Sequence, residues 1–225
     1  MLKCADVFVD SCEKAKDVLE SNIFKYVGGL YVAQEYEAGT EEEDEEAYQL
    51  IEKRNEKLDE HITNILKAIH SAISIHLEKL TLSGVKANPE DLGRAICRIK
   101  SVELDGIRLT ASEMKKVYKK IIACESLALK DLTYMATASM NFFCHEDVLG
   151  KTNPKLFASV AIRMESLKAM VDSRVATAVL DKIINCSDIK LQTLKLGNIS
   201  NKIFLSTFFL VKVLFNWVLS LSQFY

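Results

Sequence analysis

The chain has 225 residues, a formal net charge of −2, 49% hydrophobic residues and 27% charged residues. This composition supplies enough apolar surface for a core and excludes a largely disordered chain. The near-neutral net charge gives no overall electrostatic attraction toward nucleic acid or an anionic membrane. Only 2 prolines and 8 glycines occur, which is too few for the turns of an all-β protein of this length, so we expect long helices.

The first predicted unit is an N-terminal helix with a short extension, residues 1–38. Apolar residues from Leu2 to Ile23 recur at steps of three and four, which places them on one helical face. Gly28 and Gly29 should end this helix. Residues 39–46, GTEEEDEE, follow as an acidic linker or as the solvated start of the next helix.

The strongest helical pattern spans residues 45–82. Its near-heptad apolar stripe is typical of a coiled coil, and polar Asn55 within it could fix the register. We expect this stripe to pack within the chain or against a partner protein. The candidate partner-binding residues are Ile51, Leu58, Ile62, Ile65 and Ile69.

Two local signals predict where further helices begin. Asn88 is a candidate cap followed by Pro89 at the first helical position. Thr110 and Glu113 form the pattern of a capping box, which opens a helix expected to reach about Cys144. Residues 102–109 alternate in a strand-like way around Asp105-Gly106, so a small β-hairpin is the one non-helical element expected.

The predicted fold is an all-α antiparallel bundle of long helices covering residues 47–198. Helices near 45–82, 111–144 and 155–185 have similar lengths and short connections, which favours antiparallel packing. No fixed-period repeat indicates a solenoid. Residues 199–225 are set apart as an apolar C-terminal helix.

The C-terminal segment, residues 203–225, has almost the length of a membrane span. Lys212 near its middle disfavours a tail anchor, and the polar residues Lys212, Asn216 and Ser220 recur on one face. A helix packed on the bundle, a tail anchor, a helix lying in a membrane interface, and an aberrant tail without an evolved role remain alternatives.

Reactive side chains are poorly arranged for catalysis. Cys144 and His145 are adjacent, and neighbouring residues on a helix point about 100° apart, so they would not face each other there. No phosphate-binding glycine loop or zinc-ligand spacing occurs. The 6 cysteines form no CxxC pair and suit reduced residues of an intracellular, most simply cytoplasmic, protein. We therefore expect no catalytic residue, cofactor or metal site.

One basic stretch is a candidate polyanion-binding surface. It consists of Arg94, Arg98, Lys115, Lys116, Lys119 and Lys120. The lysines lie opposite the apolar face of their predicted helix, as on any amphipathic helix, so nucleic-acid binding is the weaker hypothesis.

The functional hypothesis from the sequence is a non-enzymatic helical adaptor, scaffold or assembly subunit that acts through protein–protein contacts. The alternatives are a tail-anchored membrane protein with a cytosolic bundle, and binding of nucleic acid or acidic lipid through residues 94–120.

Overall fold

The computed structural model describes residues 5–34, 45–135, 153–198 and 204–205. In this part of the chain strands alternate with helices, so the predicted all-α bundle is wrong and the fold is α/β. The strands are β1 Asp6–Val9, β2 Gly29–Ala33, β3 Lys79–Ser83, β4 Ser101–Asp105, β5 Asp131–Met135, β6 Ser166–Val171, β7 Thr193–Asn198 and β8 Phe204–Leu205. The helices are α1 Cys12–Ser21, the 3-10 helix η1 Ile23–Lys25, α2 Glu45–Ser71, α3 Pro89–Ile96, α4 Ala111–Ala123, α5 Pro154–Ala161 and α6 Ser173–Ile184.

The strands form one 8-stranded sheet in which each strand pairs with the next strand of the chain. Strands β1 to β7 are parallel, and β8 is antiparallel to β7. A Rossmann fold shares this alternation of parallel strands and helices, but its strand order reverses at the point where the dinucleotide binds. The sequential order of the described strands has no such reversal. It is the order of a solenoid, in which each β–α unit stacks on the one before.

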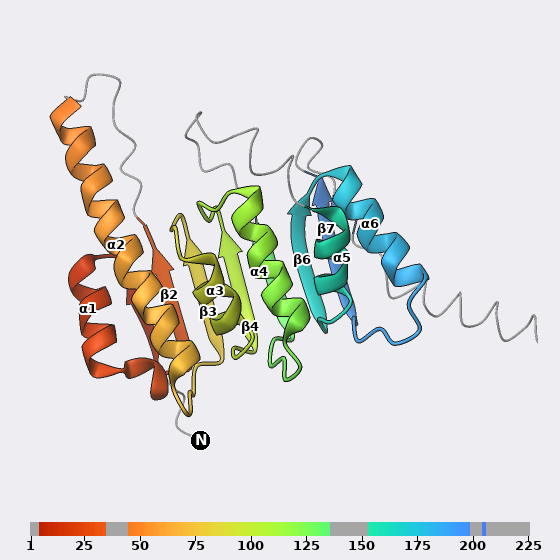
Figure 1. Ribbon diagram of the computed structural model, residues 1–225, viewed down its shortest axis with the longest axis horizontal. Coiled ribbons are helices and arrows are strands. Elements are labelled where there is room, and N and C mark those ends of the chain that lie inside the picture. The colour runs from red at the N-terminus through yellow and green to blue at the C-terminus, as the bar shows by residue number, and fades with distance from the viewer. Residues whose placement is uncertain (1–4, 35–44, 136–152, 199–203, 206–225) are drawn as a thin grey trace, which may run out of the picture.

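The helices α1 to α6 form a single layer on one side of the sheet (Figure 1). Each of these helices contacts the next one along the chain. Right-handed connections between sequential parallel strands place every crossover on the same face, which explains the single layer. The core lies between this layer and the sheet, and alternate residues of the strands β2 to β7 are buried in it.

An apolar pattern repeats at the strands. A buried pair separated by one residue lies on each strand from β2 to β7, and another apolar residue precedes the pair by three positions. The repeats begin at Val27, Leu77, Ile99, Leu129, Met164 and Leu191. Connections of unequal length separate them, so the chain has stacked units without a fixed period, and for this reason no fixed-period repeat indicates them in the sequence.

The near-heptad stripe does not form a coiled coil. Helix α2 ends at Ser71, and the predicted continuation to residue 82 contains β3 instead. Leu80 belongs to the core side of that strand, whereas Ile73 is 102% exposed. The apolar residues before and on β3 are also three positions apart, so in the sequence they look like a continuation of the helical stripe.

Strands also divide the other long helices that were predicted from the sequence. The predicted N-terminal helix, which was expected to end at Gly28, covers β1, α1 and η1 instead. The predicted hairpin over 102–109 overlaps β4, which pairs in parallel with β3 and β5. The helices expected to reach residues 144 and 185 are divided by chain reversals into shorter helices and strands. The starts predicted at Asn88 and Thr110 are confirmed by their side-chain caps.

Several predictions concern residues outside the described ranges. They include most of the acidic run 39–46, the cluster Cys144–Asp147 and nearly all of the segment 203–225. Among the described residues, no helix has the length and apolar character required to cross a membrane.

Candidate functional site on the open face of the sheet

The sheet face opposite the helix layer, called the open face below, presents three rows of side chains. Strand register aligns these rows across β1 to β7, because residues two apart on a strand point to the same face. The central row is Phe8, Tyr31, Thr81, Glu103, Thr133, Lys168 and Lys195. One flanking row is Asp6, Gly29, Lys79, Ser101, Asp131, Ser166 and Thr193. The other flanking row is Ala33, Ser83, Asp105, Met135, Met170 and Gly197.

An exposed aromatic pair lies at the β1–β2 end of the open face. The rings of Phe8 and Tyr31 stack with centroids 4.8 Å apart and an angle of 17° between their planes. Phe8 is 64% exposed even in this stack. The ammonium of Lys79 lies 5.0 Å from the centroid of Tyr31 and 3.8 Å from a carboxylate oxygen of Glu103. These contacts join four neighbouring strands across the open face.

Gly29 allows this arrangement. A Cβ atom at this position would collide with the Asp6 carboxylate and would lie 2.9 Å from Cε2 of Tyr31. The ring of Tyr31 therefore leans over the space that Gly29 leaves open. The glycine thus supports the position of the aromatic pair.

The charge on the open face changes along the sheet. Glu103, Asp105 and Asp131 place carboxylates on β4 and β5, whereas Lys168 and Lys195 place ammonium groups on β6 and β7. Both of these lysines are exposed. The face therefore runs from an aromatic end through an acidic centre to a basic end.

A second polar cluster lies where β2, β3 and β4 end. Arg108 donates to Oδ2 of Asp59 at 2.6 Å, to Oε1 of Gln34 at 3.0 Å and to the carbonyl of Gly84 at 3.0 Å. The other carboxylate oxygen of Asp59 accepts the backbone N–H of Lys86 at 2.8 Å. Burial raises the pKa of Asp59 and outweighs the opposing effects of the Lys86 amide and Arg108. Ligands often bind at the carboxyl ends of parallel strands, but every group here already has a partner, which suits a structural role.

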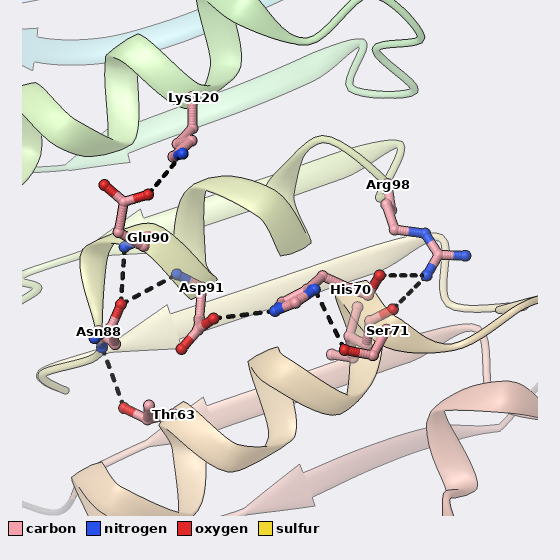
Figure 2. A network of polar contacts seen from close by, with 9 residues as sticks. Thr63, His70, Ser71, Asn88, Glu90, Asp91, Arg98 and Lys120 are labelled. Atoms are coloured by element: carbon pink, nitrogen blue, oxygen red, sulfur yellow. Dashed lines mark hydrogen bonds and ion pairs between the residues drawn. The ribbon is translucent and has the colours of Figure 1, made fainter.

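Polar contacts also join successive helices of the layer, as Figure 2 shows. Nε2 of His70 on α2 lies 3.0 Å from a carboxylate oxygen of Asp91 on α3. The backbone N–H of Asn88 donates to the hydroxyl of Thr63 at 3.1 Å. Glu90 pairs with Lys120 of α4 at 2.7 Å, and this contact lowers the pKa of Glu90. In each of these hydrogen bonds and ion pairs both partners belong to the helix layer, so the contacts hold neighbouring units together.

The residues predicted to bind a partner lie mostly in the chain's own core. Leu58, Ile62, Ile65 and Ile69 are buried under α2, with exposed fractions of 3% or less. Ile51 lies in the same helix, and its side chain is outside the described set. The stripe therefore packs within the chain and against the sheet.

The predicted basic patch is divided by the structure. Arg94, Lys115, Lys116 and Lys119 are exposed on the helix layer. Arg98 instead donates to backbone carbonyls at the end of α2, and Lys120 is paired with Glu90. Two of the six cations are thus engaged within the chain.

The open face was not recognised from the sequence, although one signal could have led to it. The repeated pattern of buried residues identifies which strand positions face the helices, and the residues between them must then face the other way. Among the described residues, no group of three His, Cys, Asp or Glu side chains is placed to hold a metal ion.

A scan against protein-family models gives no match to this chain, and neither does a search of curated proteins. Its function is therefore inferred from the geometry of the described residues.

Proposed function

We propose that this chain is a non-enzymatic protein-interaction module that binds a partner polypeptide across the open face of the sheet. The observation that carries the proposal is the alignment of outward-facing side chains into continuous rows, with the stacked Phe8–Tyr31 pair exposed at one end. Solenoids commonly use an extended face of this kind for binding. The proposal keeps the adaptor role expected from the sequence and assigns it to a different surface.

The helix layer is a poorer candidate for this role. Its apolar residues already face the sheet, and Leu58, Val117 and Phe157 are buried there. The open face instead presents an aromatic side chain that nothing described covers. Exposed aromatic residues supply much of the binding energy in protein interfaces, so Phe8 and Tyr31 are the proposed anchors.

Site-specific photo-crosslinking in cells tests the proposal. A benzophenone amino acid is placed at Thr133 on the open face or at Lys119 on the helix layer, and adducts are identified by mass spectrometry. We expect a defined protein adduct from Thr133 and none of the same identity from Lys119. Adducts formed equally from both positions, or only from Lys119, would contradict the proposal.

A variant of the anchor sharpens this experiment. Phe8→Ala should reduce the yield of the Thr133 adduct at least tenfold, because the loss of a residue that dominates an interface costs about 2 kcal/mol or more of binding. The exposed position of Phe8 means that its removal should leave the fold intact, which thermal unfolding can verify. The matched control is Tyr26→Ala, which removes another exposed aromatic residue, 71% exposed, outside the rows.

A further inference from the structure

Lys168 and Lys195 form a like-charged pair on the open face. They are register partners on the adjacent strands β6 and β7, and both are exposed. Neighbouring strands lie about 4.8 Å apart, and like charges directly opposite each other destabilise a sheet. Among the described residues neither lysine forms an ion pair, whereas Lys79 and Lys130 are paired with Glu103 and Glu165.

Hydroxyl groups lie on one side of this pair. Ser166 and Thr193 lie beside the two lysines in one flanking row, and Met170 and Gly197 lie in the other. A carboxylate placed between the lysines would relieve their repulsion, and the hydroxyls could donate hydrogen bonds to it. The β6–β7 end therefore has the chemistry of an acceptor site for carboxylates.

We infer that the open face binds an acidic segment of its partner protein, with the carboxylates over Lys168 and Lys195. This inference rests on the proposed function and names the chemistry of the partner. Glu103, Asp105 and Asp131 on the neighbouring strands repel a carboxylate from the centre of the face. The repulsion fixes the acidic part of the partner at the basic end.

The aromatic pair gives the segment its second anchor. The four strand steps from Tyr31 to Lys168 span about 19 Å at about 4.8 Å a step, which is the length of about six extended residues. The favoured ligand is thus a segment with an apolar residue at one end and a glutamate or aspartate cluster about six residues away. A nucleic acid fits less well, because its continuous phosphates would cross the acidic centre.

Four synthetic probes with a fluorescent label test this inference by anisotropy with the full chain. Two peptides carry a tryptophan and a cluster of three glutamates six residues apart, one with the tryptophan first and one with the glutamates first. The third probe is a peptide of the same design with lysines in place of the glutamates. The fourth probe is oligo-dT. The variant is K168E/K195E, and the matched control is K115E/K119E, which makes the same charge change on the exposed helix layer.

We expect at least one glutamate peptide to bind the unmodified chain and the control alike, and to bind K168E/K195E at least tenfold more weakly. The lysine peptide should show the reverse preference for K168E/K195E. Four results would overturn the inference: no binding of either glutamate peptide, binding unchanged in K168E/K195E, equal weakening in the control, or tighter binding of oligo-dT.

The crosslinking experiment separates this failure from failure of the proposed function. If the Thr133 adduct forms equally in the K168E/K195E background, the open face binds a protein but the lysine pair does not select it. If the adduct is lost only in that background and persists in K115E/K119E, the inference is supported.

Discussion

Arg98 and Arg163 take the same position in two different units of the sheet. Each follows a short helix and reaches back to the carbonyl end of the longer helix before it. The acceptors are the backbone carbonyls of Ile69, His70 and Ala72 for Arg98, and of Ile121, Ile122 and Cys124 for Arg163. The last carbonyls of a helix have no partner within it, and the planar guanidinium supplies several donors in a fixed geometry.

The equivalence extends beyond the arginines. Asn88 and Pro89 begin α3 as Asn153 and Pro154 begin α5, and each pair precedes its arginine by the same number of residues. Ser101 and Ser166 then begin the following strands at equivalent positions. The chain thus repeats a module of a long helix, a strand and a short helix with its arginine.

Replacement of Arg98 by alanine should destabilise the chain by about 2–3 kcal/mol, because partly buried carbonyls lose hydrogen bonds to a charged donor. Arg98→Lys should recover only part of this loss, since an ammonium lacks the forked donors of a guanidinium. Urea unfolding measures the free energies. The control is Arg94→Ala, which removes an exposed arginine of the same segment and should stay within about 0.5 kcal/mol. Equal effects of the two alanine variants would contradict the capping role.

Helix starts could be predicted because they depend on a few neighbouring residues. Asn88 accepts the backbone N–H groups of Glu90 and Asp91, and Thr110 exchanges hydrogen bonds with Glu113. These contacts are local, so the residue types and spacing were sufficient evidence for them.

The strands could not be separated from the helices in the same way. Leu77 and Leu80 precede Leu82 in the strand pattern, yet their three-residue step also continues the stripe of α2. The scarcity of glycine also misled the prediction of long helices. Gly84 and Gly106, with φ of 67° and 55°, turn the chain directly after β3 and β4, whereas the sequence pattern predicts the end of a long helix before Gly84 and a hairpin turn at Gly106.

The candidate site was harder still to predict. Phe8 and Tyr31 are far apart in the sequence and become neighbours only through parallel strand register. Lys168 and Lys195 likewise belonged to a predicted helix and to the segment following it, and neither position carried a motif. Each row of the open face takes one residue from each strand, so no short stretch of the sequence carries a signal for it. The order and register of the strands had to be known before the face could be recognised.

Gly93 permits the close approach of α3 to α4. A Cβ at this position would lie 2.7 Å from Cβ of Lys120 and 3.3 Å from the carbonyl oxygen of Val117. Gly93→Ala should therefore destabilise the chain by about 1–2 kcal/mol, although alanine is the better helix former by about 1 kcal/mol. Denaturant unfolding checks the sign, with Lys116→Ala on the exposed side of α4 as the control for a substitution to alanine. A stabilised Gly93→Ala variant would show that the helices can move apart at no cost.

Cys97 should be chemically inert while the chain is folded. Burial, together with the nearby thiol of Cys124, raises the pKa of Cys97 from its usual 9.0 to about 12. Only the thiolate reacts, so alkylation at pH 8 should be at least a hundredfold slower than for a thiol of ordinary pKa. Mass spectrometry of iodoacetamide-treated protein measures the rate, with half-buried Cys186 as the internal comparison. Denaturation should bring the two rates together, and rapid labelling of Cys97 in the folded chain would refute the prediction.

Glu113 should make the stability of the chain depend on pH in mildly acidic solution. The backbone N–H of Thr110, with its hydroxyl, lowers the pKa of Glu113 below the usual 4.5. The folded state therefore favours the carboxylate, and this stabilisation is present above pH 4.5 and is lost as the pH falls through the lowered folded-state pKa. Glu113→Gln keeps an acceptor oxygen but not the charge, so its stability deficit of under about 1 kcal/mol should be largest near pH 6 and should shrink toward pH 3. Urea unfolding at several pH values measures this difference, with Glu56→Gln on the exposed side of α2 as the control for the loss of one negative charge. A deficit that stays constant from pH 6 to pH 3 would show that the charge of Glu113 does not strengthen the capping box.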